Sequence, residues 1–369
     1  MTATRHYHAP DGTFRKILPP GAARRELAGL QMVAGLLPVP RLLGVRDTAE
    51  GREIVYEDVF ASGRCTALLA DCINSADRDL AAIPVVRKLV SQVCDYLVAA
   101  AGATGTQARL IECVPDLHLA RLVPGGRLDR WYGRPPGPAW ELGGQPVTAA
   151  DLASRSLVAG GQALGPAWPV DLPQLRSALT GNYRCATAIT QGDVTEPNLA
   201  HPMCWLDFEH AGRNALASDT ANFLWYLLGM GGWLVPAYQP AVYERTLRNP
   251  RPPVTTPVIE HLRVTGRTVE ITCTWRAGAG RQAALATLLH RLATDLGTAL
   301  APGTCDTTCL RPFLATRILG VIPLHQMSGP HAILCLAQLA GLRQRTWDLA
   351  SWCATHPADH LANSPANSA

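Results

Sequence analysis

The sequence predicts an α+β fold of two lobes, with a small β-rich lobe at the N-terminus and a large, mainly helical lobe after it. The length of 369 residues exceeds the usual size of one domain and suits two lobes that share a cleft. Short strand-like runs are concentrated before residue 60, whereas helical apolar periodicity dominates the remainder. We therefore assign residues 1–60 to the small lobe, 61–356 to the large lobe and 357–369 to a disordered tail.

The composition excludes several classes of protein. Apolar residues make up 47% of the chain, enough for a sizeable core, and the net charge of +4 is too small to indicate a nucleic-acid or membrane partner. The eleven cysteines are scattered without a C-x-x-C pair, which favours free thiols in a reducing compartment. The N-terminus lacks a signal-peptide pattern, so we predict a cytoplasmic protein and leave its oligomeric state open.

The small lobe is predicted to begin with a hairpin. Arg5–Ala9 and Thr13–Leu18 read as strands that flank the turn-forming Pro10-Asp11-Gly12. Lys16 lies in the second strand, and the only other lysine in the chain is Lys88. The remaining elements expected in this lobe are a helix over Ala22–Leu36, which carries Glu26, and strands over Leu42–Val45 and Arg52–Val59.

In the large lobe, Pro115–Gly144 is rich in Gly, Pro, Arg and Trp and is predicted to be a long loop or insertion. Val258–Val264 and Thr268–Trp275 alternate around a turn and indicate a second hairpin. Helices are predicted over Asp77–Ala101, Thr148–Ala163, Leu172–Leu179, Thr220–Leu228, Gln282–Leu300, Thr304–Ile322 and Gly329–Trp352.

The stretch between Ile189 and Asp219 carries the candidate chemistry. A strand over Ala186–Thr190 is followed by Gly192-Asp193, and a second apolar run, Met203–Leu206, ends at Asp207. His201-Pro202 suggests a tight reversal that would set the two runs side by side.

Asp193, Asn198 and Asp207 would then converge on one small volume. Two carboxylates and an amide oxygen form the kind of hard-oxygen site that suits Mg²⁺.

This pattern resembles the catalytic core of the aminoglycoside phosphotransferase and choline kinase family, relatives of the protein kinases. The resemblance rests on Gly192-Asp193, Asn198, Asp207-Phe208-Glu209 and Asp219, which occur in the order and spacing of that family. It implies a protein-kinase-like fold in which Asp193 is the catalytic carboxylate and Asn198 and Asp207 hold the metal.

Three further residues are implied to support this core. By the resemblance, Asp219 braces the catalytic loop and Glu209 completes the segment that begins at Asp207. The family's histidine before the Gly-Asp pair is replaced here by Gln191, which can form hydrogen bonds but carries no charge.

The N-terminal block resembles the small lobe of the same family. The resemblance implies that Lys16 contacts the α- and β-phosphates of a nucleotide and pairs with Glu26, and that backbone groups of Glu57–Val59 bind the purine. Only fifteen residues precede Lys16, so the small lobe is expected to be truncated. Either the loop that covers the phosphates in the family is missing, or Asp11-Gly12 serves as a shortened version.

The implied activity is transfer of the γ-phosphoryl group of ATP or GTP, with Mg²⁺, to a hydroxyl of a small molecule. Within the family, an antibiotic or a natural-product intermediate is the expected acceptor, for resistance or for biosynthesis. Two alternatives remain open. A non-catalytic kinase-like binding protein is favoured by the short N-terminus and Gln191, and a dinucleotide-dependent enzyme by Gly278 and Gly280, which precede a predicted helix.

Overall fold

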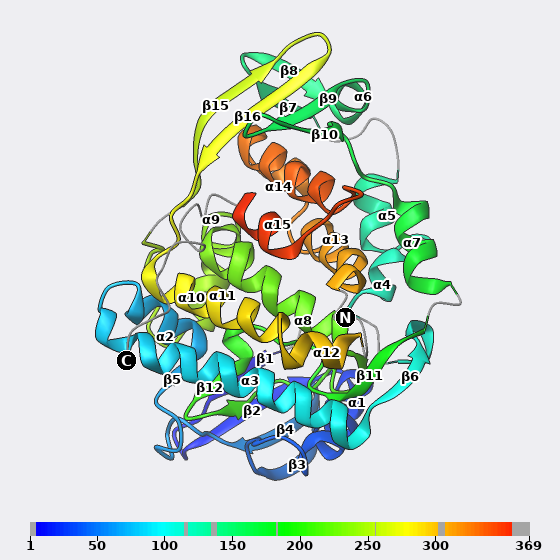
Figure 1. Cartoon of the computed structure of the whole chain (residues 1–369). Helices are drawn as coiled ribbons and strands as arrows, with labels where there is room; N and C mark the ends of the chain where they lie inside the picture. The colour runs from blue at the N-terminus through cyan, green and yellow to red at the C-terminus, as the bar shows by residue number, and fades with distance from the viewer. Residues whose placement is uncertain are drawn as a thin grey trace.

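The computed structural model describes residues 5–113, 117–133, 139–181, 184–254, 256–301 and 307–355. A small lobe built on a sheet lies at the bottom of Figure 1 in blue, and a larger, mainly helical lobe lies above it. The two-lobe α+β organisation predicted from the sequence is therefore confirmed. The predicted disordered tail, 357–369, lies outside the described residues.

The small lobe is a four-stranded antiparallel sheet with one helix against it. Its strands follow the order β1-β2-β4-β3. Helix α1 buries Ala23, Leu30 and Val33, and Pro20 stands in its first turn, where a missing N–H costs no hydrogen bond. The elements are β1 (Arg5–His8), β2 (Thr13–Leu18), α1 (Pro20–Val33), β3 (Leu42–Thr48) and β4 (Gly51–Glu57).

Behind the cleft, the large lobe packs α3 (Ile83–Thr104) against α2 (Leu69–Ala76), α11 (Ala279–Leu292) and α12 (Asp295–Leu300). The helix predicted over Asp77–Ala101 begins later, at Ile83, and Pro84 stands in the first turn of α3, so this proline marks a helix start and not a kink. The preceding helix, α2, ends at Ala76. A short 3₁₀ turn, η1 (Leu80–Ala82), connects them.

Two small antiparallel sheets carry the site. The first has the order β14-β11-β6 and the second β13-β12-β5. The predicted pairing of the two central runs is wrong: His201-Pro202, a cis peptide, reverses the chain between β12 and β13, while β11 pairs with β14 and β6. The strands are β5 (Ala67–Leu68), β6 (Thr106–Arg109), β11 (Arg184–Thr190), β12 (Leu199–His201), β13 (Cys204–Trp205) and β14 (Gly212–Ala215).

Helix α8 (Leu216–Trp225) is buried along its whole length and continues into a π-helical stretch, η4 (Tyr226–Leu234). It packs against β11 on one side and against α13 (Arg311–Gly320) on another. The neighbouring helices are α4 (Leu119–Leu122), α5 (Arg127–Tyr132), α7 (Leu172–Thr180), α9 (Val235–Tyr238) and α10 (Pro240–Thr246). Short 3₁₀ turns are η2 (Leu110–Glu112), η3 (Glu196–Asn198), η5 (Thr307–Leu310) and η6 (Leu324–Gln326).

The loop predicted over Pro115–Gly144 is only partly correct, because α4 and α5 lie within it; residues 114–116 and 134–138 lie outside the described part of the chain. The helix predicted over Thr304–Ile322 is shorter, as α13 begins at Arg311.

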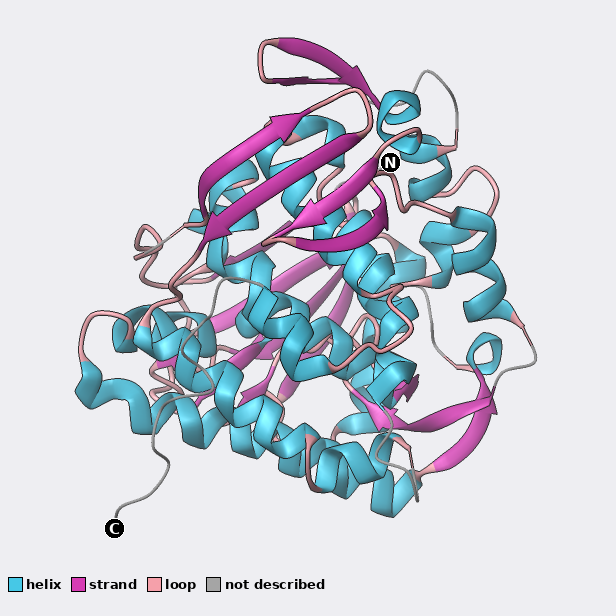
Figure 2. Cartoon of the chain, turned by 45° about the horizontal axis from the view of Figure 1, so that its top comes forward, coloured by secondary structure: helices cyan, strands magenta, loops and turns pink. Residues whose placement is uncertain are grey.

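A third sheet covers the end of the large lobe farthest from the cleft, with the order β10-β9-β16-β15. Figure 2 shows its strands gathered in one layer. The strands are β9 (Ser156–Ala159), β10 (Gln162–Pro166), β15 (Val258–Val264) and β16 (Thr268–Thr274), with a separate hairpin of β7 (Ala139–Leu142) and β8 (Gln145–Thr148). The β15–β16 hairpin agrees with the prediction.

The helix predicted over Thr148–Ala163 is wrong. Only α6 (Ala149–Ala153) is helical, and β9 and β10 follow it. Gly160 and Gly161 both have left-handed φ angles, which turn the chain between the two strands.

The last helices are α14 (Gly329–Gly341) and α15 (Leu349–Thr355), separated by a bend where one helix was predicted. Among the described residues, none of the helices combines the length and the apolarity needed to cross a membrane.

Candidate active site

A cavity of about 520 Å³ lies between the two lobes. The small lobe contributes side chains of β1, β2 and β4, and the large lobe contributes the segments around Asp193 and Asp207. The lining residues that carry the predicted chemistry are Lys16, Glu26, Glu57, Val59, Asp193, Asn198 and Asp207. The cleft therefore brings together seven of the ten residues predicted for the site.

Lys16 stands at the centre of this cleft. Its Nζ donates to Oε1 of Glu26 and to Oδ1 of Asp207, each at 2.7 Å. Glu26 also accepts from the hydroxyl of Tyr56 at 2.9 Å and from the backbone N–H of Phe208 at 3.3 Å. Burial opposes the charge on Lys16, but Asp207 and Glu26 raise its pKa well above the usual range. The lysine is therefore a fixed positive charge at the cleft.

Asp207 follows β13 and faces this lysine. Its φ of 60° is in the left-handed region that non-glycine residues rarely adopt, a conformation found in functional loops. Desolvation opposes ionisation, but the charge and hydrogen bond of Lys16 hold the pKa of Asp207 below its usual value. The carboxylate is therefore ionised at neutral pH, as a metal ligand must be.

Two amide side chains hold the carboxylate of Asp193. Nδ2 of Asn222 donates to Oδ1 at 2.7 Å, and Nδ2 of Asn198 donates to Oδ2 at 3.2 Å and to the Asp193 carbonyl at 2.9 Å. Both amides donate hydrogen bonds to the carboxylate oxygens, so they fix the orientation of the Asp193 side chain. Asn222 was not predicted from the sequence, although its place three residues after Asp219 on one helix face offered a signal.

Gln191 connects the Asp193 loop to the Asp207 segment. Its Nε2 donates to the carbonyls of Leu206, at 2.9 Å, and of Asp207, while its Oε1 accepts the backbone N–H of Asp193 at 2.9 Å. The side chain is fully buried. A neutral amide can fill this position because it donates and accepts at the same time.

Gly192 is required by the path of the loop. A Cβ at this position would lie 2.0 Å from the carbonyl oxygen of His210, and its φ of +84° is left-handed. The Gly-Asp pair therefore follows from the close approach of the loop to the segment after Asp207.

Asp219 lies beneath the loop, buried in α8. Its Oδ2 accepts the hydroxyl of Thr190, the last residue of β11. Burial, opposed by that hydrogen bond and assisted by the charge of Asp193, raises the pKa of Asp219 to about 7. This position fits the predicted bracing role.

Glu209 lies outside the cavity lining. Its Oε1 accepts from Nη2 of Arg25 in α1 at 2.6 Å, so it connects the two lobes at their surface instead of facing the cleft. The contact of Glu209 that could support the catalytic segment is therefore this one hydrogen bond between the lobes.

The segment Glu57–Val59, which the resemblance implies to bind the purine, is here called the hinge and begins at the end of β4. The backbone N–H of Glu57 donates to the carbonyl of Arg41 at 2.9 Å, and that of Asp58 donates to Gly12 at 3.3 Å. Within the described contacts, the N–H of Val59 is the one of these three that forms no hydrogen bond. The Glu57 carboxylate instead pairs with Arg41, at 3.1 Å.

The turn at Asp11-Gly12 is one of the two options considered above for a loop over the phosphates. Its Gly12 carbonyl bonds to the hinge, and neither turn residue lines the cavity. Instead His6, which pairs with Lys16 in the hairpin register, lines the cleft beside the lysine. Arg245 and Arg248, from α10 and the segment after it, also reach the cavity and were not predicted.

A metal ion fits the donors between Asn198 and Asp207. The amide nitrogen of Asn198 is used by Asp193, which leaves its oxygen for a ligand, and Asp207 offers a carboxylate. Amide and carboxylate oxygens are donors that Mg²⁺ accepts together with water and phosphate oxygens. Within the described ranges, three or more His, Cys, Asp and Glu side chains nowhere gather into a metal-binding group.

The dinucleotide site considered at Gly278 and Gly280 is contradicted. A Cβ at Gly280 would lie 2.5 Å from the carbonyl of Ile73, so this glycine lets α11 approach α2. Asp77 already occupies the start of α11, where its Oδ1 accepts the N–H of Arg281 at 3.0 Å. A carboxylate at that position repels the phosphate that a dinucleotide would place there.

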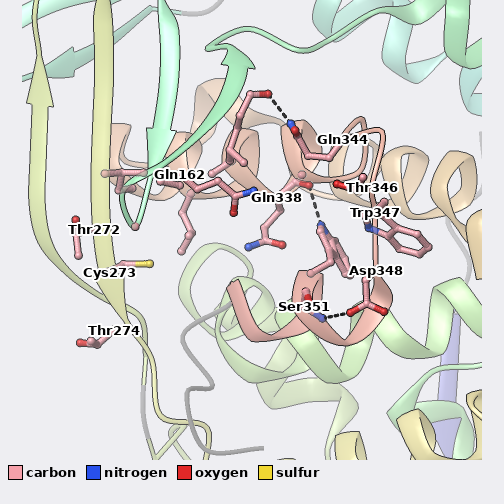
Figure 3. Close-up of a pocket in the computed structure, with 18 of the residues that line it drawn as sticks. Gln162, Thr272, Cys273, Thr274, Gln338, Gln344, Thr346, Trp347, Asp348 and Ser351 are labelled. Carbon is pink, nitrogen blue, oxygen red and sulfur yellow. Dashed lines mark hydrogen bonds between the residues drawn. The ribbon is translucent and has the colours of Figure 1, made fainter. Parts of the chain in front are cut away.

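A second cavity, of about 560 Å³, lies far from this chemistry, between the third sheet and helices α14 and α15 (Figure 3). Gln162, Gln338 and Gln344 are among the polar side chains that face it, and Trp347 and Trp352 form part of its wall. Its described lining includes no lysine or arginine and none of the residues predicted for the site.

A lysine of the small-lobe sheet, paired with a helix carboxylate above an Asp–Asn loop, is the arrangement of the protein-kinase-like fold. The fold class predicted from the sequence is confirmed in this respect.

No family model and no curated protein matches the sequence. Similar solved structures include a glucosamine kinase, crystal form B, with 16% identity, a TM-score of 0.45 and coverage of 91% of this chain and 75% of that one. Another is glucosamine kinase in complex with glucosamine, ADP and inorganic phosphate, with 15% identity, a TM-score of 0.43 and coverage of 91% and 74%. Aminoglycoside phosphotransferase APH(3'')-Id from Streptomyces rimosus has 15% identity, a TM-score of 0.36 and coverage of 66% and 84%.

Proposed function

We propose that the protein is a small-molecule kinase, which transfers the γ-phosphoryl group of ATP or GTP to a hydroxyl of a small acceptor. The observation that carries this proposal is the position of Asp193, which is held by Asn198 and Asn222 in the cavity that also contains Lys16 and Asp207. A base, a phosphate-binding cation and a metal-ligating carboxylate are the parts that phosphoryl transfer requires.

The small lobe and hinge would bind the nucleotide. Lys16 would contact the α- and β-phosphates while Glu26 keeps its ammonium in place. The backbone at Glu57–Val59 would hold the base, with the N–H of Val59 as donor. Arg245 and Arg248 add positive charge to the same cavity.

Asn198 and Asp207 would hold Mg²⁺, which when bound neutralises charge on the phosphates. Asp193 would orient the acceptor hydroxyl and accept its proton as the oxygen bonds to the γ-phosphorus. The bond from that phosphorus to the bridging oxygen breaks, and the nucleoside diphosphate leaves with the electron pair. Gln191 and Asp219 would keep the loop in position for this step.

A hydroxylated natural product or antibiotic is the acceptor class we propose, in a cytoplasmic enzyme of resistance or biosynthesis. The test is to incubate the protein with Mg²⁺-ATP or Mg²⁺-GTP and a panel of such compounds, and to detect phosphorylated product by mass. Asp193→Asn serves as the inactive control and the exposed Glu244→Gln as the matched active control.

Nucleotide binding without turnover on any acceptor, unchanged in Asp193→Asn, would instead support the non-catalytic binding protein. The ion pair between Lys16 and Asp207 is the feature that favours this second candidate, because it occupies a carboxylate oxygen that a metal would use.

A further inference from the structure

Three basic side chains of the large lobe lie close together, two of them buried and one half-buried, and the charge of Asp193 acts on both of the arginines. They are His118, just before α4, Arg121 in α4 and Arg317 in α13, and we call them the basic cluster. His118 is 1% exposed and Arg317 is 3% exposed. None of these residues belongs to the nucleotide cavity or to the site predicted from the sequence.

The basic cluster has donors without acceptors. Among the described residues, Nη1 of Arg121, Nε and Nη1 of Arg317 and both ring nitrogens of His118 are buried and form no hydrogen bond. An unpaired buried charge is costly, and proteins therefore provide it with a counter-ion or a ligand.

Another buried arginine of the same lobe shows the usual solution. Arg281 is 4% exposed, and its Nη1 and Nη2 lie 2.6 and 3.2 Å from the two carboxylate oxygens of Glu196. Its Nη1 also donates to the carbonyl of Leu227 at 2.9 Å. Among the described residues, Arg121 and Arg317 have no such carboxylate, although Arg317 is buried as deeply as Arg281.

Tyr226 connects the cluster to the cleft. Its ring lines the cavity together with Asp193, and Cζ of Arg317 lies 6.0 Å from the ring centroid. Arg121 lies against Gly320, one helical turn after Arg317, where a Cβ would be 3.1 Å from its Cδ. The guanidinium group of Arg317 therefore lies against a tyrosine that lines the cleft, and Arg121 packs against the same helix one turn away.

The electrostatics agree with this placement. Burial, followed by the charges of Arg317 and Arg127, lowers the pKa of Arg121 to about 8, while Asp193 opposes the shift. Burial likewise lowers the pKa of Arg317, and the charge of Asp193 again opposes it. Asp193 is thus within electrostatic reach of both arginines, but no ion pair joins them in the described structure, so a further anion would be stabilised here.

We infer that the acceptor carries an oxyanion, a carboxylate or a phosphate, which Arg121 and Arg317 bind while its hydroxyl lies at Asp193. This inference rests on the proposed function and names the class of substrate: a hydroxylated anion. Arginine binds both oxyanions through paired N–H donors. A polycationic aminoglycoside would meet like charges at the basic cluster and is excluded as the preferred acceptor.

The first test measures binding directly. The protein is saturated with Mg²⁺ and a non-hydrolysable ATP analogue, so that the nucleotide phosphates are already in place. Inorganic phosphate and gluconate are then titrated in parallel with neutral glucose and cationic glucosamine, and thermal shift and calorimetry report binding. We expect the two anions to bind and the neutral and cationic compounds to bind at least tenfold more weakly. Equal or better binding of glucose or glucosamine, or no binding of either anion, would overturn the inference.

Substitutions of Arg317 and Arg121 test whether these two side chains bind the anion. Arg317→Gln and Arg121→Gln should each weaken anion binding at least tenfold, while Arg317→Lys should recover part of it. The matched control is Arg263→Gln, an exposed arginine of β15, which should behave as wild type. The melting temperature of ligand-free Arg317→Gln should equal or exceed that of wild type, because an unpaired buried charge is removed. A lower melting temperature together with unchanged anion binding would make Arg317 a structural residue.

The same measurements separate this inference from the proposed function. If the ATP analogue stabilises the protein but the anions do not bind through Arg121 and Arg317, the kinase proposal stands and the anionic acceptor is wrong. If the anions bind through these arginines but no nucleotide binds, the kinase proposal fails. If Arg317→Gln weakens nucleotide binding and leaves anion binding unchanged, the arginine binds the γ-phosphate. The inference is then also wrong.

Discussion

Nζ of Lys16 and Oδ1 of Asp207 lie 2.7 Å apart, although 191 residues separate them in the sequence. This hydrogen-bonded ion pair crosses the cleft and joins the second strand of the small lobe to the segment after β13. The cation proposed to bind phosphates is thereby bonded to the carboxylate proposed to bind a metal. Nucleotide and metal would have to enter together, because each takes over one partner of the pair.

Lys16→Ala should remove measurable nucleotide binding, since no glycine-rich loop covers the phosphates in the described part of the small lobe. Lys16→Arg should rescue little, because a planar guanidinium does not replace a compact ammonium between two carboxylates. Titration calorimetry with Mg²⁺-ATP measures both variants. Lys88→Ala, the exposed second lysine, is the control and should bind as wild type. Tight, metal-independent binding by Lys16→Ala would show that the small lobe is wrongly assigned.

Asp193→Asn should fold normally and lose at least about 10²-fold in turnover. The substitution keeps the size of the side chain but removes the group that accepts the hydroxyl proton. Turnover on the acceptor identified by the mass assay, together with the melting temperature, checks this. Near-normal turnover would exclude Asp193 as the base.

Asp207→Ala should abolish Mg²⁺-dependent stabilisation by nucleotide and leave the ligand-free melting temperature almost unchanged. Its side chain is 49% exposed, and half-exposed ion pairs contribute at most about 1 kcal/mol. Lys16 also keeps Glu26 as a partner. The measurement is thermal shift with and without Mg²⁺. A large fall in ligand-free stability with binding intact would make Asp207 a structural residue.

Asn222→Asp should move the acidic limb of the pH–rate profile to higher pH. The new carboxylate would lie about 2.7 Å from Oδ1 of Asp193, and a like charge at that distance disfavours the ionised form. Asn222→Ala, which removes a hydrogen bond to the carboxylate without adding charge, should lower turnover and move the limb in the same direction by a smaller amount. If the two variants have superimposable pH profiles, Asn222 does not act through the charge of Asp193.

Asp219 should make folding less favourable as the pH rises. Burial raises its pKa to about 7, so between about pH 4 and 7 the folded state keeps a proton that the unfolded state releases. The contribution of Asp219 to the free energy of unfolding therefore falls by up to about 1.4 kcal/mol for each unit by which the pH rises. Below and above that window the contribution is constant. Asp219→Asn should remove this slope.

Urea unfolding at pH 5 and pH 8 tests the slope, and the loss of stability between them should be smaller by about 2–3 kcal/mol in Asp219→Asn. Asp295→Asn is the matched control. The hydrogen bond from Arg291 is the main cause that lowers the pKa of Asp295 to about 2, so this residue stays ionised over the same range. An identical pH dependence in wild type and Asp219→Asn would contradict the assignment.

The sequence was sufficient for features set by local order. The hairpin of Lys16, the α1 helix of Glu26 and the spacing from Asp193 to Asn198 all follow from turns, prolines and periodicity within short segments. The cleft then brings these residues together as expected. Glu209 is the exception: it follows Asp207 in the motif but faces Arg25.

The predictions that were wrong concern contacts between segments that are far apart in the sequence. Residues 156–163 were predicted to be helical, but β9 pairs with β16, more than a hundred residues later, and that pairing leaves no local pattern. The same reason applies to β11, whose partners are β6 and β14 instead of the strand next in sequence. Asn222 and the basic cluster were missed because their importance lies in contacts, or in the lack of them, which the residue types do not reveal.

Gln191 gives the loop a property that a histidine would not. An imidazole at this position would change its hydrogen-bonding between donor and acceptor as it titrates near neutral pH. The amide keeps one fixed pattern, with Nε2 toward Leu206 and Oε1 toward Asp193, at every pH at which the protein is folded. The coupling between the Asp193 loop and the Asp207 segment is therefore insensitive to acidity.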